Sequence, residues 1–277
     1  MLEKEDINLF LNTLKNVSKY DLSDYSEKSL TRRINKILVD NGINLKALIF
    51  KIKSNKDFVE KVIKDITVNT TDLFRDVKVW HKIRYNILPE LAKLNNINIF
   101  HAGVSTGQEI YSMLILLNEL NLLEKSNVYG VDINSDVINR AKEGIYRFRF
   151  NLNYLDNFDD VINKNPYNFE ENRNVSIDKY FDIDRKTDTI QVKKFIRDKA
   201  NLAVADLVKN PNKFYKKYDL ILCRNVLIYF NQNLQTKIIN DFYNMLYDKS
   251  YLVLGLHESI LHNDSKFKKK QMFYIKK

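Results

Sequence analysis

The feature that most constrains the fold is an alternation of short apolar segments and amphipathic segments that begins near residue 97. Residues 108–122 and 137–143 have apolar side chains at helical spacing, and a further helix is predicted to end at Leu246. Short apolar runs that favour strands occur between and beyond these helices, at residues 97–100, 128–131, 218–223, 251–254 and 272–275. This alternation predicts an α/β fold whose parallel sheet is covered by helices on both faces.

The rest of the chain divides into two further parts. Residues 1–65 carry apolar side chains at helical spacing, which predicts a small bundle of helices. Residues 148–200 are polar and aromatic, and the alternating segment from Asp188 to Val192 predicts a small antiparallel β insert there. We therefore expect an N-terminal helical domain with its linker at residues 1–76 and a second domain at residues 77–277, which carries the insert.

The composition indicates a protein of the cytoplasm. Hydrophobic residues make up 44% of the 277 residues, and no run approaches the ~20 apolar residues that span a bilayer. The first residues are too polar for a secretory signal, and the single cysteine, Cys223, excludes an internal disulfide. The four histidines are not spaced as metal ligands, so no metal is expected. The net charge of +10 suits an anionic partner or reflects a biased composition.

A glycine-containing turn joins the first predicted strand to its helix, where a nucleotide-like ligand is expected. Gly103 and Gly107 let the backbone approach a ligand, but the turn lacks the G-x-G-x-x-G spacing, which disfavours a dinucleotide dehydrogenase. Asp132 follows the second strand, where a carboxylate accepts both hydroxyls of an adenosine ribose or simply caps a helix. Glu109 lies in the first helical turn. Such an acidic pocket favours a cation, and the sulfonium of S-adenosylmethionine (SAM) is one.

Polar residues also follow the strand predicted at 218–223. Asn225 offers a hydrogen-bond donor and an acceptor. Tyr229 offers an aromatic face and a hydroxyl, although a tyrosine at such a position is more often part of the core. The end of a central strand borders the ligand in open α/β sheets, so both residues are candidates for a site.

The segment before the α/β part carries a further group of polar residues. Asn69 and Thr71 are predicted to cap a helix that begins near Asp72. Arg75 would then lie one turn along that helix. It is either a surface residue of a linker helix or a residue that faces the site.

Four segments, in this order, resemble the CheR-type chemotaxis receptor methyltransferase family. The family's Cys-Arg-Asn-Val-x-Ile-Tyr-Phe is intact at 223–230, and its Ser-Thr-Gly-Glu-Glu-Pro-Tyr-Ser occurs at 105–112 with Gln108 and Ile110 as departures. Its Asn-x-Thr-x-Phe-Phe-Arg occurs at 69–75 with Leu73 in place of the first Phe, and Gly144-Ile145-Tyr146-Arg147 also matches. The resemblance spans about residues 20–277.

The resemblance implies a Rossmann-like, SAM-dependent methyltransferase domain that methylates glutamate side chains of bacterial chemoreceptors. The products would be glutamate methyl esters and S-adenosylhomocysteine. By position in the family's pattern, Asp132 would bind the ribose of SAM, and Glu109 would lie near its methionine end. Asp206 and Leu207 would lie near its adenine. The full set of implied SAM contacts is Asn69, Thr71, Arg75, Glu109, Asp132, Asp206, Leu207, Arg224 and Asn225.

Two of the residues above are candidates for a catalytic role. A glutamate side chain has a pKa near ~4.3, so it is already ionised at neutral pH and needs no general base. We hypothesise that Arg75 orients this incoming carboxylate through charge-assisted hydrogen bonds. We also hypothesise that Tyr229 shapes the site of methyl transfer.

Basic side chains form a stripe near the N-terminus. Lys28, Arg32 and Lys36 are four residues apart and share one helix face, and Arg33 lies beside them. The stripe is either a solvated face or a surface for the acidic cytoplasmic helices of methyl-accepting chemotaxis receptors. We expect such a receptor as the partner of a monomeric protein that neither binds nucleic acid nor inserts into a membrane.

Two other functions fit parts of the pattern. The positive net charge is compatible with another methyl acceptor such as RNA, but residues 1–80 hold 15 Lys and Arg against 12 Asp and Glu, so the excess is diffuse. A scaffold or sensor that binds SAM without catalysis would keep the same cofactor-binding residues. Transfer of a labelled methyl group distinguishes these alternatives.

Overall fold

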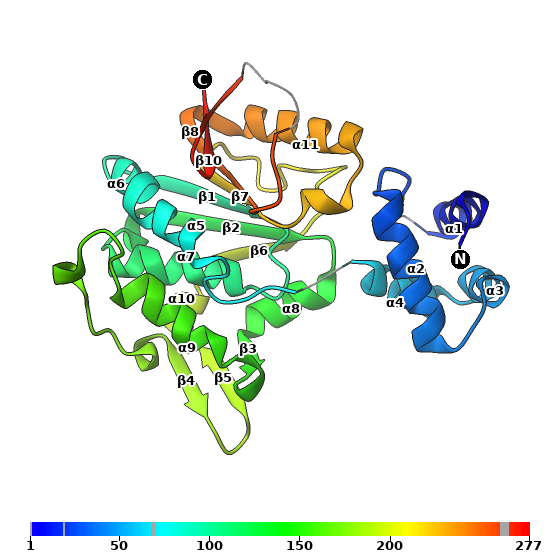
Figure 1. The fold of residues 1–277 in the computed structure, drawn as a ribbon, viewed down its shortest axis with the longest axis horizontal. Helices are drawn as coiled ribbons and strands as arrows, with labels where there is room; N and C mark the ends of the chain where they lie inside the picture. Colours follow the sequence, from blue (N-terminus) through cyan, green and yellow to red (C-terminus); the bar gives the residue numbers. More distant parts are fainter. Residues whose placement is uncertain (1, 19, 68–69, 261–265) are drawn as a thin grey trace. The chain divides into compact units, whose positions relative to one another are not determined.

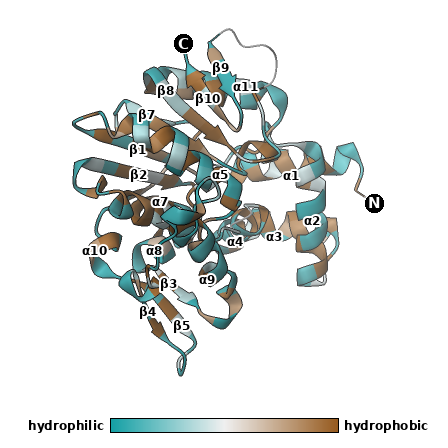
Figure 2. Cartoon of the chain, turned by 60° about the vertical axis from the view of Figure 1, so that its left-hand side comes forward, coloured by the Kyte–Doolittle hydropathy of each residue, from teal (hydrophilic) through white to brown (hydrophobic). Residues whose placement is uncertain are grey.

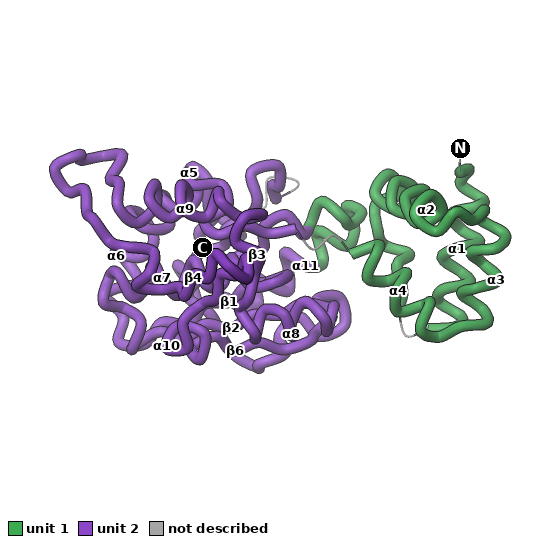
Figure 3. The backbone as a smooth tube through the Cα atoms, turned by 90° about the horizontal axis from the view of Figure 1, so that it is seen from below, with its two compact units in different colours: residues 1–68, 227–237 green, residues 69–226, 238–277 purple. Residues whose placement is uncertain are grey.

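The computed structural model describes residues 2–18, 20–67, 70–260 and 266–277. The chain forms two compact units, drawn in different colours in Figure 3. The first comprises Met1–Val68 and Leu227–Lys237, and the second comprises Asn69–Val226 and Ile238–Lys277. The sequence placed the boundary at residues 76 and 77. The structure places the boundary earlier, after Val68. It also assigns the segment Leu227–Lys237 to the first unit, which no local sequence pattern indicated.

The first unit is helical, as the sequence predicted. Asn44 caps α3 by accepting a hydrogen bond from the Ala47 amide, and Asn55 caps α4 by accepting one from the Phe58 amide. The later segment joins these helices through the Ser26 amide, which donates to the Tyr229 carbonyl at 2.8 Å. The elements of this unit are α1 (Lys4–Val17), α2 (Glu27–Asn41), α3 (Leu45–Ser54), α4 (Lys56–Ile66), the 3-10 turn η7 (Leu227–Tyr229) and the first turns of α11 (Gln232–Met245).

The second unit is built on a seven-stranded sheet within the described residues. The strand order is β6-β2-β1-β7-β8-β10-β9, in which β10 runs antiparallel to β8 and to β9. The strands are β1 (Ile97–Ala102), β2 (Ser126–Asp132), β6 (Ala200–Val204), β7 (Tyr218–Cys223), β8 (Leu246–Leu254), β9 (Phe267–Lys270) and β10 (Phe273–Lys276). The chain proceeds outward from β1 to β2 and β6, and it then returns to β7 on the other side of β1.

Helices connect the parallel strands. Helix α7 (Gln108–Glu119) lies between β1 and β2, and α8 (Ser135–Glu143) follows β2. Right-handed crossovers on the two sides of β1 place their helices on opposite faces of the sheet. Accordingly, Figure 1 shows α7 on one face and α11 on the other. The predicted α/β fold is confirmed.

A short helical stretch precedes β1. Helix α5 (Val77–Lys82) continues through the π-helical turn η1 (Ile83–Ile87) into α6 (Leu88–Leu91). The buried Arg84 of this stretch donates hydrogen bonds to the carbonyls of Val161 and Ile162, within a second π-helical turn. These contacts tie the stretch to the insert described next.

The insert is a small antiparallel sheet with the order β3-β5-β4, as predicted. Its first strand begins at Ile145, before the expected residue 148, and residues 200–204 pair with β2 in the large sheet. The elements of this region are β3 (Ile145–Arg147), α9 (Asn153–Phe158), η4 (Asp159–Asn163), β4 (Phe181–Asp184), β5 (Thr189–Val192) and α10 (Lys194–Arg197). Short 3-10 turns are η2 (Leu123–Lys125), η3 (Arg149–Asn151), η5 (Phe169–Glu171) and η6 (Ile177–Lys179).

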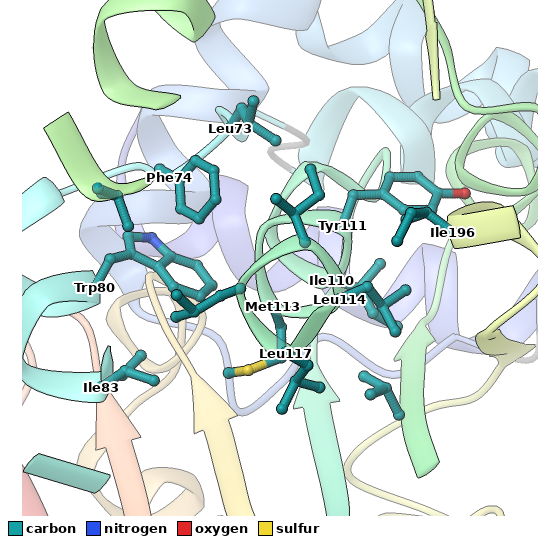
Figure 4. Close-up of a cluster of buried hydrophobic side chains, with 14 of the residues drawn as sticks. Leu73, Phe74, Trp80, Ile83, Ile110, Tyr111, Met113, Leu114, Leu117 and Ile196 are labelled. Carbon is teal, nitrogen blue, oxygen red and sulfur yellow. The ribbon is translucent and has the colours of Figure 1, made fainter. Parts of the chain in front are cut away.

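Helix α7 is the centre of the core of the second unit. Each residue from Ile110 to Leu117 is fully or almost fully buried. The sheet covers one side of the helix, and Phe74 and Trp80 pack on the other, as Figure 4 shows. Figure 2 shows the apolar colouring that runs along the strands beneath. Full burial of a Leu, Ile or Phe side chain contributes roughly 1.5–3 kcal/mol, so this helix is held firmly in place.

The prediction that a helix begins near Asp72 is wrong. Residues 70–76 form turns, and α5 begins only at Val77. Phe74 and Asp76 have φ angles of +50° and +61°, which no right-handed helix contains. The Phe74 side chain is fully buried, and its amide donates to Ser112 Oγ on α7 at 2.7 Å. Burial of this ring against α7 therefore overrides the local helical pattern.

Candidate functional site

The carboxyl ends of the central strands define the site. Strands β2, β1, β7 and β8 run parallel, so the loops that follow them gather at one edge of the sheet. The strand order reverses between β1 and β7. Ligands of open α/β sheets bind at such a switch point, outside the carboxyl ends of the strands.

The turn after β1 requires glycine at two positions. Gly103 and Val104 donate amide hydrogen bonds to the Val131 carbonyl of β2 at 2.9 and 3.0 Å. Gly103 has φ +80°, and a Cβ there would lie 2.5 Å from Val226 Cγ2. Gly107 has φ +96°, and its Cβ would lie 2.9 Å from Ala141 Cβ. Glycine at these two positions therefore lets the turn pack closely against the loop after β7 and against α8.

Asp132 ends β2 beside this turn. Its side chain accepts hydrogen bonds from the Ser105 amide at 2.9 Å and from the Asn134 amide at 3.0 Å. Burial raises the pKa of Asp132, although these backbone donors oppose the rise. A buried carboxylate that is only partly satisfied gains from further donors, and a pair of ribose hydroxyls would supply them.

Asp206 and Leu207 lie next to Asp132 because β6 pairs with β2. The Ala205 amide donates to the Asp132 carbonyl at 3.0 Å, which places the loop after β6 beside the end of β2. Leu207 is buried, and the Asp206 carboxylate accepts from the Val208 amide at 2.8 Å. The structure therefore brings together the residues for which the resemblance implied ribose and adenine contacts.

Arg224 forms a buried ion-pair network at the end of β7. Its Nη1 lies 3.0 Å from Glu109 Oε2, and its Nη2 lies 2.8 Å from Asp76 Oδ2. The same Nη2 donates to the Arg75 carbonyl at 2.8 Å. The Arg224 side chain is 1% exposed, so these contacts are made away from water. The guanidinium thus connects the loop after β7, the first turn of α7 and the segment before α5.

Glu109 has both carboxylate oxygens in use. Oε1 lies 2.9 Å from His101 Nδ1, and Oε2 takes the bond from Arg224. Burial opposes its ionisation, but the contacts with His101 and Arg224 prevail and lower the pKa of Glu109. The carboxylates of Glu109 and Asp76 and the single guanidinium of Arg224 leave one net negative charge. This edge of the sheet therefore favours a ligand with a positive charge.

Arg75 is held through its backbone. Trp80 Nε1 donates to its carbonyl at 3.0 Å, in addition to the bond from Arg224. Its guanidinium donates to the Thr70 carbonyl at 3.2 Å, next to Thr71, and the side chain is partly exposed. The charged end of Arg75 is thus accessible, while its main chain is fixed.

Asn225 is positioned by a carboxylate that the sequence did not single out. Glu258 Oε2 accepts hydrogen bonds from the amides of Asn225 and Gly255, each at 2.7 Å. This carboxylate bridges the loops after β7 and β8. It holds Asn225 in the left-handed region, at φ +58°.

Two further network residues were also missed by the sequence. Asp76 directly follows Arg75, and His101 is the penultimate residue of β1. Neither carries a spacing that distinguishes it from a surface aspartate or a core histidine. Their partners lie far away in the sequence or across a turn, so only the folded chain shows their contacts.

Several predicted residues do not join this network. Asn69 lies outside the described residues. Tyr229 belongs to the first unit, where its carbonyl accepts a hydrogen bond from the amide of Ser26, the N-cap residue of α2. On α2, Lys28, Arg32 and Lys36 are exposed and Arg33 is half-buried, and Lys36 pairs with Asp40 at 2.7 Å. The described residues contain no group of side chains that could hold a metal ion.

Comparison with known proteins identifies the family. The model for the SAM-binding domain of CheR methyltransferases matches residues 69–158 and 163–275, and the model for their all-alpha domain matches residues 5–67. The chain belongs to the CheR methyltransferase family. The resemblance inferred from the sequence motifs is thereby confirmed.

Curated relatives extend over nearly the whole chain. A chemotaxis protein methyltransferase of Borreliella burgdorferi is 30% identical over 90% of this chain and 94% of its own length. One from Campylobacter jejuni is 28% identical over 90% of this chain and 87% of its own. The solved N-methyltransferase NodS of Bradyrhizobium japonicum, in complex with S-adenosyl-L-homocysteine, has a TM-score of 0.34 and 14% identity, and covers 66% of this chain and 62% of that one. That likeness is weak, and the assignment to the CheR family does not depend on it.

The cofactor of this CheR domain is SAM, and the residues at the edge fit it. The network around Arg224 carries one net negative charge, which suits a sulfonium. Two buried polar atoms, Ser105 Oγ and Arg224 Nε, have no hydrogen-bond partner within the part of the chain that the structure describes. Buried polar groups are normally satisfied, so these atoms indicate a place for polar ligand groups. No helix of the described chain is both long and apolar enough to cross a bilayer.

Proposed function

We propose that this methyltransferase transfers a methyl group from SAM to glutamate side chains of bacterial chemotaxis receptors. The products are glutamate methyl esters and S-adenosylhomocysteine. The names of the relatives, which are chemotaxis protein methyltransferases, support the receptor as acceptor. The anionic network of Glu109, Asp76 and Arg224 at the switch point carries the proposal for the chemistry, because it favours a sulfonium donor.

The proposed SAM site has two ends. Asp132 accepts the ribose hydroxyls, and Asp206 and Leu207 contact the adenine beside it. Glu109 faces the methionine end, where the net negative charge lies. The other proposed contacts, which line the loops after β7 and before α5, are Asn69, Thr71, Arg75, Arg224 and Asn225.

The protein has a limited chemical task in this reaction. SAM supplies a methyl group that its sulfonium already activates. The glutamate acceptor is ionised at neutral pH, with a pKa near ~4.3, so no residue needs to remove a proton. The side chains must instead align the carboxylate and exclude water, and alignment of this kind accounts for much of an enzyme's rate enhancement.

Arg75 is proposed to align the acceptor. Its backbone is fixed by Trp80 and Arg224, while its guanidinium is partly exposed and bonds only one carbonyl, that of Thr70, among the described residues. A guanidinium that is anchored in this way can form two parallel bonds to a carboxylate. Tyr229 is proposed to shape the site of methyl transfer.

The basic stripe of α2 is proposed to bind the receptor. Its exposed side chains, Lys28, Arg32 and Lys36, would contact the acidic helices that carry the methylated glutamates, with Arg33 beside them. Lys36 also pairs with Asp40, whereas the described residues give neither Lys28 nor Arg32 an ion-pair partner. We further propose that the protein acts as a monomer in the cytoplasm, where the receptor's helical domain lies.

Labelling with tritiated SAM tests the proposal. The protein is incubated with receptor-containing membranes, with the same membranes lacking receptor, and with RNA. Receptor label that alkali releases as methanol is expected, because glutamate methyl esters hydrolyse under base. Label on RNA would instead support the nucleic-acid acceptor. SAM binding without transfer to any of these would support a scaffold or sensor.

A further inference from the structure

Asn225 has a backbone conformation that its own side chain does not explain. Its φ angle of +58° lies in the left-handed region, which costs energy for a residue with a Cβ. Asparagine often offsets this cost with a hydrogen bond from its side chain to a nearby backbone group. Here the side-chain amide makes no hydrogen bond to any residue that the structure describes. The surroundings must therefore impose the conformation, and the amide stays available to a ligand.

The residues on either side of Asn225 are anchored independently of it. Arg224, before it, is held by its ion pair with Glu109 at 3.0 Å. Val226, after it, packs against the turn that follows β1, since a Cβ on Gly103 would lie 2.5 Å from the Cγ2 atom of Val226. Asn225 thus lies between two fixed points, and the direction of its backbone N–H determines how the residue is turned.

The carboxylate of Glu258 sets that direction. Its Oε2 accepts hydrogen bonds from the amides of Asn225 and Gly255, each at 2.7 Å. The turn that carries this carboxylate is closed by the Glu258 amide, which donates to the Gly255 carbonyl at 3.0 Å. Hydrogen bonds to a carboxylate are stronger than those to a neutral acceptor, so one side chain joins the loop after β7 firmly to the loop after β8.

Gly255 provides the space that this arrangement needs. A Cβ at this position would lie 2.6 Å from Glu258 Oε2, 2.9 Å from the Asn225 nitrogen and 3.0 Å from Asn225 Oδ1. The backbone at the end of β8 therefore packs directly against both the carboxylate and the Asn225 side chain. Any larger residue would push the carboxylate away from the amide that it holds.

The place of Asn225 in the fold connects this arrangement to the cofactor. Asn225 follows β7 at the switch point of the sheet, where ligands of open α/β sheets bind. Strained backbone positions persist where the surroundings over-determine them, and they cluster at such sites. A glycine at position 225 would adopt the same conformation without strain. The asparagine side chain therefore has a task that outweighs the cost of its backbone.

We propose that Glu258 is a positioning residue of the SAM site, which aims the Asn225 amide at the cofactor and so makes the loop after β8 part of that site. This inference rests on the proposed contact between Asn225 and SAM. Glu258 contributes to binding through its hydrogen bond to Asn225, so its effect on SAM affinity requires the Asn225 side chain.

Calorimetry with SAM on matched variants tests this role. Glu258→Ala removes the acceptor and is expected to weaken SAM binding about tenfold, because Asn225 is then free to leave the left-handed region. Glu258→Gln keeps an acceptor oxygen and should restore most of the affinity. Asp184→Ala is the matched control, because Asp184 Oδ1 also accepts bonds from two amides, those of Lys186 and Thr187, in the turn between β4 and β5. That variant should bind SAM as the wild type does.

A double-mutant cycle separates positioning from a structural defect. Asn225→Gly removes the side-chain amide, while glycine adopts the φ angle of +58° without strain. This variant should weaken SAM binding on its own. Glu258→Ala should then cause little further loss in the Asn225→Gly protein, because the group that Glu258 aims is gone. A general defect of the fold would instead weaken binding by the same factor in both backgrounds, and that result would overturn the role.

The same variants distinguish this inference from the proposed site. If Asn225→Gly leaves SAM affinity unchanged, the proposed contact of Asn225 fails, and the inference fails with it. If Asn225→Gly weakens binding and Glu258→Ala does not, the contact stands and the role of Glu258 is overturned. If Glu258→Ala does not fold, Gly255→Ala decides, because it keeps the carboxylate but displaces it. Unchanged SAM binding by Gly255→Ala would overturn the role.

Discussion

Arg224 Nη1 lies 3.0 Å from Glu109 Oε2, and this ion pair joins the loop after β7 to the first turn of α7. The pair spans the point where the strand order of the sheet reverses. Because Arg224 also binds Asp76, the buried network has one more carboxylate than it has guanidinium groups. The same contacts therefore stabilise the fold and set the charge of the proposed SAM site.

The first prediction concerns the pH dependence of stability. The pKa of Glu109 is lowered in the folded protein, so its ionised form stabilises the fold above the ordinary glutamate pKa of 4.5. Glu109→Gln should therefore be less stable than the wild type at pH 7. As the pH falls below 4.5 and through the lowered pKa, the wild-type carboxylate gains its proton and the difference should shrink.

Urea unfolding at pH 7, 5 and 4 measures this difference. A substitution of the exposed Asp156 by Asn, on α9, is the control for the loss of a surface carboxylate. A stability difference for Glu109→Gln that grows as the pH falls would contradict the sign of the argued pKa shift.

The second prediction concerns the ribose contact. Asp132→Asn keeps the size of the side chain but turns one acceptor oxygen into a donor that faces backbone amides. Hydrogen bonds to a charged group contribute ~1.5–3 kcal/mol, so SAM affinity should fall roughly tenfold to a hundredfold. Calorimetry measures the dissociation constant for SAM in the wild-type protein and in the variant. Product affinity should fall equally because both ligands carry the ribose, and a loss confined to SAM would exclude a ribose contact.

The third prediction concerns Arg75. Arg75→Ala should leave SAM bound while it slows methyl transfer to the receptor, because its main-chain contacts with Trp80 and Arg224 do not involve the guanidinium. Steady-state kinetics at saturating SAM should show a lower kcat, or a higher KM for receptor, while calorimetry should show that SAM still binds. Arg75→Lys should recover only part of the rate, since an ammonium lacks the planar pair of donors. Undiminished methylation by Arg75→Ala would refute the role.

The fourth prediction concerns the basic stripe of α2. Reversing the charges of Arg32 and Arg33 to Glu should weaken receptor methylation more at low salt than at high salt, because salt screens exposed charges. Reversal of Lys46 and Lys53 on α3 gives the same change in net charge and is the control. Equal loss in the two double variants, or a loss that does not respond to salt, would argue against a specific receptor surface.

The alternation of apolar and amphipathic segments was sufficient to predict the central strands and α7, because buried parallel strands are continuous apolar runs. The sequence analysis did not predict the two edge strands of the sheet, β6 and β9. Residues 200–204 are only partly buried, and residues 267–270 are three lysines after a phenylalanine, so neither contains an apolar run. The sequence analysis also failed to predict the turns around Phe74. Burial of the Phe74 ring against α7 determines the backbone conformation there, and the local spacing of residues carries no information about that contact.

Some residues of the candidate site could likewise be predicted from the sequence, and others could not. Asp132, Glu109 and Asn225 follow strands or begin a helix, so their place at the carboxyl edge could be read from the strand order. The contact of Arg224 with Asp76 joins residues that are 148 positions apart. The roles of His101 and Glu258 likewise depend on which strands are neighbours. Sequence motifs can identify residues with such distant partners only through resemblance to a known family. The segments that match the family do not include Asp76, His101 or Glu258.

The central claim is that the acidic carboxyl edge of the sheet binds SAM as a cation, and calorimetry on the wild-type protein tests it most directly. The account predicts saturable one-to-one binding of SAM, and it predicts that Glu109→Gln weakens this binding. Absence of measurable affinity for SAM, or an affinity for SAM that Glu109→Gln does not alter, would contradict it.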